Sequence, residues 1–357
     1  MSIETLSIGD TGAQLVSKFN QNFSRVDPAP FFNVKGFGAI GDGVTDDSVA
    51  INNAVTVAEL HGGTIYFPAG TYLTGTIDLN ANINIVGDGL TSILKSIAAE
   101  PLLRYLDDEI NRPWIHDIYL DGGGVGTSGI YLNRCNAFYL NNITIANFTV
   151  AGIYAKGVLI CAFYNIIITT CPIGFYCYAS TTPFSLAANL IKLYNCHFRY
   201  CSSWAIEWNS GQLLCLDLCG AELCGTEGNS ETGVIKYLAG NSITNLRSIG
   251  LSLKDCWFEY NYGTIIDIRS WLENRAVHSV IDTCLFTLNT ESVVVNLYSH
   301  YNKGCSLKVR DSSFSDAAAF TLTGTETVLI NDSSQIYGSI TQNGDAKYYT
   351  VDITEVT

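Results

Sequence analysis

Asn195-Cys196-His197-Phe198 is the stretch that decides the fold, because close copies of it recur along the chain. The copies are Asp255-Cys256-Trp257-Phe258, Thr283-Cys284-Leu285-Phe286 and Asp311-Ser312-Ser313-Phe314. Each copy is a short β-type stretch that ends in an apolar residue three positions after Asn, Asp or Thr. With that apolar residue as a marker, weaker copies extend the series to Leu120, Ile145, Ile168, Phe198, Ala221, Phe258, Phe286 and Phe314. Markers lie from 23 residues (145 to 168) to 37 residues (221 to 258) apart, and a recurring period of this size is typical of repeat architectures.

Cysteines fall in the same register as the markers. Two residues before a marker stand Cys196, Cys219, Cys256 and Cys284, and three residues after one stand Cys171, Cys201 and Cys224, replaced later by Asn261 and Asn289. Small, weakly polar cysteine suits a narrow stacked interior, and a protein made in the cytosol keeps its thiols reduced. Zinc needs ligands clustered around one point, whereas these cysteines form columns. We therefore predict free core thiols, no metal and no cofactor.

Short strands in register columns predict an all-β fold, a parallel β-helix whose coils stack about 4.8 Å apart. Because one coil cannot bury its own face, the stack depends on neighbouring coils and needs a cap. We assign the coils to residues 113–324, with a second strand eight residues after the marker, at Ile153, Tyr176, Ile206, Ile266, Val294 and Leu322. Residues 31–112 begin the β-helix and include a capping helix that starts near Asp46, Asp47 and Ser48.

The two ends of the chain follow other patterns. In residues 1–30, Leu15, Phe19, Phe23 and Val26 form a narrow apolar stripe at helical spacing. This helical segment either packs on its own domain or serves in attachment and oligomerisation. Residues 325–357 lose the repeat but keep β-type residues, which indicates a C-terminal cap or a trimerisation segment.

Charge and hydropathy exclude several classes of function. The 357 residues contain 19 Lys and Arg against 33 Asp and Glu, a net charge of −14. Binding to nucleic acid depends on Lys and Arg contacts to phosphate, so no nucleic-acid partner is expected. No apolar run reaches the roughly 18 residues that cross a bilayer, and the first residues lack the features of a signal peptide. We therefore expect neither membrane insertion nor a signal peptide.

Residues 37–47 (Phe-Gly-Ala-Ile-Gly-Asp-Gly-Val-Thr-Asp-Asp), 62–72 and 85–89 resemble the start of pectate-lyase-like right-handed β-helix domains. Thr11-Gly12, Lys18-Phe19-Asn20 and Asn22-Phe23 are similar to a short segment of phage tail fibre proteins. The resemblance implies a bacteriophage tailspike, a homotrimer in the virion that is made in the host cytoplasm. It further implies binding to bacterial capsule or O-antigen polysaccharide, often with cleavage, and attachment to a tail or baseplate protein through the N-terminal segment. The matching motifs carry no catalytic residue.

One column of outward positions suggests chemistry. One residue after successive markers stand Arg199, Glu222 and Glu259. Glycoside hydrolysis uses two carboxyl groups, about 5 Å apart in retaining enzymes and farther apart in inverting ones. If Glu222 and Glu259 lie on adjacent coils, their spacing is near 5 Å, whereas an extra coil within the long interval makes it about 10 Å. The competing interpretation is a surface ladder of salt bridges, which contributes little to stability.

Further candidates surround this column. Glu207 and Asp267 stand nine residues after their markers, and Asp217 is a spare carboxylate on the Glu222 coil. Trp204, Trp208 and Trp257 either present platforms for sugar rings or pack at coil corners. The catalytic candidates are therefore Glu222, Glu259, Glu207, Asp267 and Asp217, and the substrate-binding candidates are Arg199, Trp204, Trp208 and Trp257. Insertions within 177–189 and 225–250 are expected to wall a groove, and His116, His197 and His278 look isolated.

Three functions are consistent with these observations. The first is a tailspike that hydrolyses polysaccharide with two carboxylates. The second is a receptor-binding or structural tail protein of the same fold without turnover. The third, which the residues favour least, is a polysaccharide lyase, for which Arg199 or Arg269 would neutralise a uronate.

Overall fold

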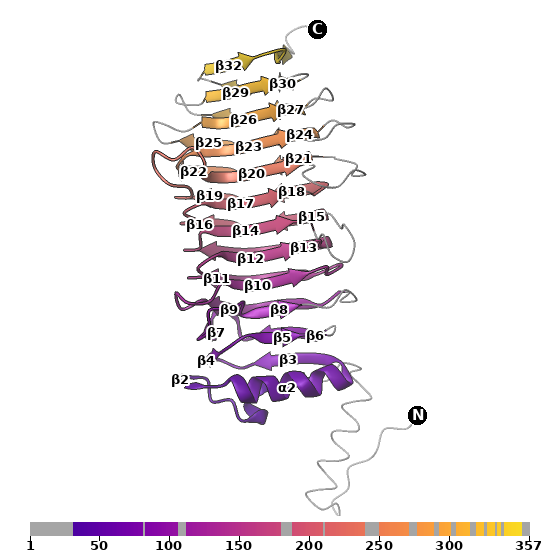
Figure 1. The fold of residues 1–357 in the computed structure, drawn as a ribbon, viewed down its shortest axis with the longest axis vertical. Helices are drawn as coiled ribbons and strands as arrows, with labels where there is room; N and C mark the ends of the chain where they lie inside the picture. Colours follow the sequence, from indigo (N-terminus) through magenta and orange to yellow (C-terminus); the bar gives the residue numbers. More distant parts are fainter. Residues whose placement is uncertain are drawn as a thin grey trace, which may run out of the picture.

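The computed structural model describes residues 31–80, 83–105, 112–179, 188–209, 211–239, 250–270, 277–288, 293–300, 305–314, 319–324, 327–332, 334–336 and 339–351. These residues form one long stack of coils with a single α-helix, α2 (Ser48–His61), across one end (Figure 1). The named strands all pair in parallel, so the predicted β-helix architecture is confirmed. The predicted N-terminal helical segment, residues 1–30, lies outside the described residues.

One side of the stack is an eleven-stranded sheet, to which each coil gives one strand. Its strands are β5 (Ile77–Leu79), β8 (Leu103–Tyr105), β10 (Ser128–Asn133), β12 (Ala151–Lys156), β14 (Ile173–Tyr178), β17 (Trp204–Asn209), β20 (Gly233–Ala239), β23 (Thr264–Ser270), β26 (Val293–Ser299), β29 (Ala319–Gly324) and β32 (Ser339–Asn343). Residues on these strands alternate between a buried and a partly exposed face, as expected when one face covers a core.

The remaining strands form a bent sheet with two arms. The first arm contains β1 (Phe31–Asn33), β3 (Gly63–Phe67), β6 (Ile83–Gly87), the first halves of β9 (Trp114–Asp121), β11 (Tyr139–Ala146) and β13 (Leu159–Thr169), then β15 (Asn189–Tyr194), β18 (Leu213–Asp217), β21 (Gly250–Lys254), β24 (Val277–Asp282), β27 (Cys305–Arg310), β30 (Thr327–Asp332) and β33 (Lys347–Val351). The second arm contains β2 (Asp42–Asp46), β4 (Gly70–Thr74), β7 (Ser92–Ser96), the second halves of β9, β11 and β13, then β16 (His197–Arg199), β19 (Gly220–Glu222), β22 (Trp257–Asn261), β25 (Leu285–Leu288), β28 (Ser313–Phe314) and β31 (Gln335–Ile336).

A column of left-handed residues makes the bend between the two arms. Their φ angles lie between 45° and 56°, at Asp117, Asn142, Asn165, Asn195, Leu218, Asp255, Thr283 and Asp311. Asn and Asp tolerate this conformation better than other residues with a β-carbon, which explains the Asn or Asp that opens most repeats. The side chains also bond along the column, since Asn142 donates to Asp117 and Asn195 donates to Asn165.

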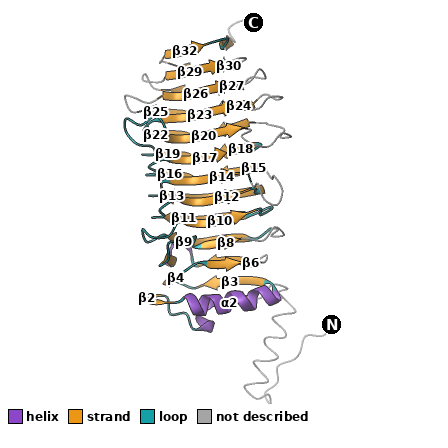
Figure 2. Ribbon diagram, viewed as in Figure 1, coloured by secondary structure: helices purple, strands orange, loops and turns teal. Residues whose placement is uncertain are grey.

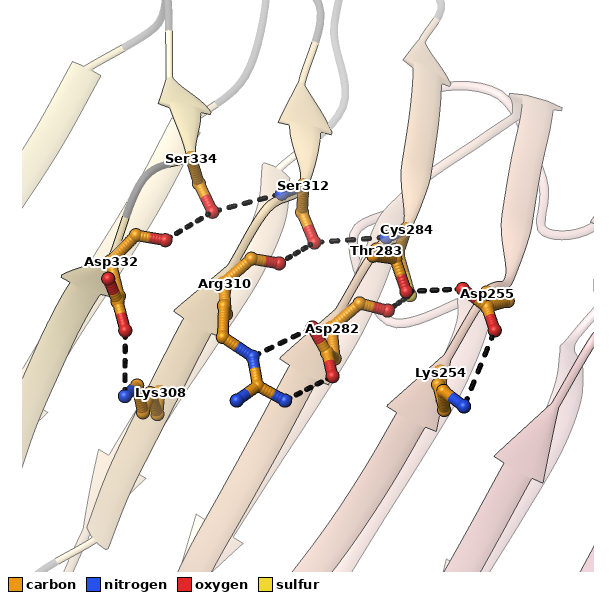
Figure 3. Close-up of polar contacts among 10 residues, drawn as sticks. All are labelled: Lys254, Asp255, Asp282, Thr283, Cys284, Lys308, Arg310, Ser312, Asp332 and Ser334. Carbon is orange, nitrogen blue, oxygen red and sulfur yellow. Dashed lines mark hydrogen bonds and ion pairs between the residues drawn. The ribbon is translucent and has the colours of Figure 1, made fainter.

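The predicted cysteine column is confirmed. Residues that follow these cysteines donate backbone hydrogen bonds to the cysteine one coil back: Gly220 to Cys196, Trp257 to Cys219 and Leu285 to Cys256. The column continues as Ser312 and Ser334, whose hydroxyl oxygens accept from the backbone N–H of Cys284 (3.0 Å) and of Ser312 (3.1 Å) (Figure 3). All twelve cysteines are free, and burial raises the pKa of Cys161 to about 12.

The second strand of the repeat departs from the predicted register at three coils. The inward column runs Ile153, Phe175, Ile206, Ile235, Ile266, Val295 and Phe320. The assignments of Tyr176, Val294 and Leu322 to this column are therefore wrong by one or two residues. The turn after Ile168 is one residue shorter than the turn after Ile145, so Tyr176 points outward.

Two further segments differ from expectation in a simple way. The insertion 225–250, expected as a loop, contains β20, a strand of the eleven-stranded sheet. Parallel pairing also continues past residue 324, where β30 joins β27 and β33 joins β30. Figure 2 shows this stack of strands from the helix to the C-terminal end.

The helix α2 covers the first coils at one end of the core. It buries Ala50, Ile51, Ala54, Val55 and Ala58. Asp47 precedes the helix, and its buried carboxylate accepts hydrogen bonds from the backbone N–H groups of Ile40 (2.7 Å) and Gly41 (3.0 Å). The acidic motif at the start of the domain therefore serves the turn before the helix. No described helix has the length and apolar character needed to cross a lipid bilayer.

Candidate functional site

Arg199, Glu222 and Glu259 occupy the same outward position on consecutive rungs of the second arm. Arg199 is the register partner of Glu222, and Glu222 is the register partner of Glu259. The 37-residue interval therefore hides no extra coil in this arm, because β19 pairs directly with β22. Adjacent strands lie about 4.8 Å apart, so the two glutamates match the closer of the two predicted spacings.

The three side chains of this carboxylate column have different partners. Arg199 Nη2 lies 2.7 Å from Glu222 Oε2, which holds that carboxylate beside a positive charge. Glu259, one rung farther along, makes no ion pair with any described residue. Arg199 and Glu222 are both partly exposed, at 42% and 24% of their side-chain surface, so solvent weakens the pair. The column thus presents one paired and one unpaired carboxylate side by side.

An imidazole and an indole lie next to the carboxylate column. Trp257 lies across Gly220, because a β-carbon on Gly220 would be 2.4 Å from the indole ring. The Trp257 ring reaches the His197 ring on the coil beyond, with 5.6 Å between their centroids. Burial, followed by the nearby Arg199 cation, lowers the pKa of His197, so the imidazole is neutral at pH 7. Its Nε2 is buried and has no hydrogen-bond partner among the described residues.

His197 was expected to be isolated, and the structure corrects this. Gly220 is the signal in the sequence, because a glycine within a strand often marks the close approach of another group. Trp257 is half-buried and faces outward, as its position beside Glu259 predicted.

The second predicted carboxylate pair is not formed. Glu207 and Asp267 share a column of the eleven-stranded sheet, but Lys236 lies between them. Lys236 Nζ is 3.3 Å from Glu207, whereas Asp267 is buried and receives Arg269 (2.8 Å) and the Asn296 amide (2.9 Å). Lys236 comes from the strand β20, which the sequence analysis did not predict.

Trp204 and Trp208 are buried, so their predicted contact with substrate is wrong. Trp204 is 2% exposed and carries Lys236 Nζ above its ring at 5.6 Å. Trp208 is fully buried and stacks on Tyr237, with 6.2 Å between ring centroids. Trp208 faces inward with Ile206, because alternate residues of a strand share a face. Trp204 begins the strand and is covered by the side chain of Lys236 from the outward column.

Asp217 belongs to a different face from Glu222. It ends β18 in the first arm, where Lys192 Nζ lies 3.8 Å away. The bend at Leu218 separates it from β19, which carries Glu222. The carboxylate of Asp217 therefore pairs within the first arm and not with the carboxylate column.

A tyrosine patch that was not predicted lies on the eleven-stranded sheet. Tyr131, Tyr154 and Tyr176 precede Glu207 in one outward column, and Tyr178 lies beside them. The Tyr154 ring contacts the other three at 5.4 Å, 5.0 Å and 5.4 Å between centroids. Such half-buried rings have the flat apolar faces on which sugars stack. The error of one residue at Tyr176 concealed this column.

Metal chemistry has no support among the described side chains. Within the ranges given above, no group of three or more His, Cys, Asp or Glu residues has the arrangement to hold a metal ion.

A comparison with protein families matches the N-terminal part of the chain. A family model described as rhamnogalacturonase A/epimerase, pectate lyase-like, matches residues 31–101. Over 122 residues the chain is 34% identical to mannuronan C5-epimerase AlgE2 of Azotobacter vinelandii. That match covers 28% of this chain and 11% of the epimerase, so the chain spans a small part of that relative.

Solved structures cover far more of the fold. ORF18 of Geobacillus virus E2 superposes with a TM-score of 0.63 and 20% identity, over 98% of this chain and 66% of that one. The gp42 tailspike of Acinetobacter phage vb_AbaP_AS12 gives a TM-score of 0.60 and 10% identity, over 90% of this chain and 62% of the tailspike. Together with the parallel register and the match over residues 31–101, these likenesses identify the chain as a protein of the pectate-lyase-like parallel β-helix fold.

Proposed function

We propose that this protein is a phage tailspike that binds bacterial surface polysaccharide and hydrolyses it with Glu222 and Glu259. The observation that carries the proposal is the position of these two residues on adjacent rungs, with Arg199 paired to one of them. A spacing of about 5 Å is the one expected for retaining glycoside hydrolysis.

The two glutamates take different roles in this proposal. Glu222, whose carboxylate is held beside the Arg199 cation, attacks the anomeric carbon, while Glu259 protonates the oxygen of the leaving sugar. Water then cleaves the glycosyl-enzyme bond, with Glu259 acting as the base that accepts its proton. Trp257 at the end of the column offers a ring face to the sugar, and the tyrosine patch supplies a second aromatic surface.

A direct test uses purified protein and capsular or O-antigen polysaccharides. New reducing ends without absorbance of an unsaturated uronate support hydrolysis, whereas both signals together indicate a lyase. Glu222→Gln and Glu259→Gln should each abolish turnover, while the variants stay folded and the mass of the assembly stays unchanged. Glu227→Gln, which changes an exposed glutamate in a turn, is the matched control. Full activity in both site variants would refute the assignment.

A non-catalytic receptor-binding protein is the second candidate. The Arg199–Glu222 ion pair favours it, because the same contact is expected in a surface salt-bridge ladder. Binding of polysaccharide without new reducing ends would select this function over hydrolysis.

The assembly is also part of the proposal. We propose a homotrimer in the virion, joined to a tail or baseplate protein through residues 1–30. The likeness to a phage tailspike and a viral protein supports this location. Light scattering on the full chain should give three times the mass of one chain.

A further inference from the structure

We propose that the outward face of the first arm, from Trp114 to Tyr164, binds an uncharged glycan chain. Trp114, Tyr139 and Tyr164 serve as its ring platforms, and His116 serves as a fixed hydrogen-bonding group. This site shares with the proposed function only the class of ligand, polysaccharide. The carboxylate column lies on the second arm, so binding here does not require hydrolysis there.

His116 is held in one orientation from two sides. Its ring stacks on that of Trp114, with 4.6 Å between centroids and 17° between planes. Its Nδ1 lies 2.6 Å from the Asp117 carboxylate. Asp117 sits at the bend with a φ of 56°, and the Asn142 amide donates to its other carboxylate oxygen. When Nδ1 carries the proton toward Asp117, Nε2 is left with a lone pair.

His116 and Asp117 lie at the surface and not in the core. The side chains of His116 and Asp117 retain 35% and 40% of their exposure. An exposed side chain that is already fixed loses little conformational freedom when a ligand binds, which favours affinity. A sugar hydroxyl is a suitable partner for Nε2, because it both donates and accepts hydrogen bonds.

Aromatic rings continue the face along the next two coils. Tyr139 is the register partner of Trp114 and is 42% exposed. Its own partner on the following coil is the small Ala162, so its ring leans onto Tyr164 at 5.2 Å between centroids. These rings give the apolar, rigid surfaces on which pyranose rings stack.

The same arm changes character farther along the stack, and this contrast argues for an uncharged ligand. Asp217, Lys254, Asp282, Arg310 and Asp332 alternate in sign along one column. Figure 3 shows that charged side chains of this region pair with one another. Arg310 Nε donates to Asp282 at 2.9 Å, and Lys308 Nζ lies 2.8 Å from Asp332. The charged part therefore has few groups left for a ligand.

The aromatic part has no cation to attract a polyanion. The outward strand positions of β9, β11 and β13 in the first arm are Trp114, His116, Tyr139, Asn141, Ala162 and Tyr164. None of these described residues is Lys or Arg, and the adjacent carboxylate, Asp117, is engaged by His116 and Asn142. The cation on the next rung is Lys192, the register partner of Ala162, and its Nζ lies 3.8 Å from Asp217 and over the Tyr194 ring. A uronate polymer would have to compete with Asp217 for this cation, whereas uncharged sugars would find rings and a polar atom.

The experiment is an array of bacterial capsular and O-antigen polysaccharides with both uncharged and uronate-containing members, probed with the full chain. Glu222→Gln protein is used in parallel, so that cleavage cannot remove the ligand. We expect binding to uncharged members, and we expect Trp114→Ala or Tyr139→Ala each to weaken it about tenfold, the loss of one aromatic contact. His116→Ala should weaken it as well.

The control is Tyr200→Ala, which removes an exposed tyrosine from the turn after the second arm. Circular dichroism melts confirm that each variant is folded. The proposal is overturned by binding restricted to uronate polymers, by no binding to any array member, or by equal losses in Tyr200→Ala and Tyr139→Ala. Failure of hydrolysis alone leaves this site intact, because the array measures binding in both proteins.

Discussion

Trp257 lies over the backbone of Gly220, so the absence of one β-carbon brings the indole against His197 on the far coil. Three consecutive rungs thereby share one surface beside Glu222 and Glu259. The missing side chain of Gly220 therefore sets the orientation of Trp257, which is the proposed platform for a sugar ring.

Gly220→Ala should displace Trp257 and lower both stability and turnover. The new methyl group would stand 2.4 Å from the ring, so the indole must rotate away. We expect a loss of about 1–3 kcal/mol in the free energy of unfolding, the cost of overpacking, measured by urea denaturation. Gly36→Ala is the control, since nothing lies within 4 Å of its added carbon. Unchanged stability and activity in Gly220→Ala would contradict the packing described here.

Arg199→Ala should separate the two interpretations of the carboxylate column. A partly exposed ion pair contributes less than about 1 kcal/mol, so the urea midpoint should barely move. If Arg199 keeps Glu222 ready for catalysis, polysaccharide cleavage should nevertheless fall about a hundredfold. Lys in its place should recover part of that rate. Equal, small changes in both quantities would favour the surface ladder.

His197 should make the protein less stable in mild acid. Burial and Arg199 lower the pKa of the folded imidazole below its ordinary value of 6.5, so the unfolded chain binds more protons in that range. Stability contributed by neutral His197 is present above pH 6.5 and is lost as the pH falls toward the lower folded pKa. The difference in urea midpoint between pH 7.5 and pH 5.5 should shrink in His197→Gln. An identical difference in both proteins would show that His197 does not cause the loss of stability in acid.

Cys256→Ser should be well tolerated. The Cys256 thiol donates to the Lys254 carbonyl at 3.2 Å, and Ser312, two coils along the same column, donates to the Arg310 carbonyl at 2.8 Å. Serine therefore already fills an equivalent position, and we expect a cost below about 1.5 kcal/mol, close to one hydrogen bond. Cys256→Leu should cost more because the column is tightly stacked. Thermal melts of the two variants provide the measurement.

Most of the fold was predictable because its signals are local and repeated. The cysteines two residues before four of the markers and the Asn or Asp at most of the bends defined the register over many coils. Arg199, Glu222 and Glu259 followed from that register. The prediction failed where coils changed length: the short turn before Tyr176 concealed the tyrosine patch, and the insertion that holds β20 concealed Lys236. Trp208 was placeable, since it alternates in phase with Ile206.

The alternating charges of the first arm also bear on how the coils find their neighbours. A strand that skipped one coil would set Asp217 against Asp282 and Lys254 against Arg310, so each mistake would bring like charges together. Correct stacking is the arrangement that pairs opposite signs at every step. In a fold of nearly interchangeable rungs, this column penalises misassembly and guides each coil onto the one made just before it.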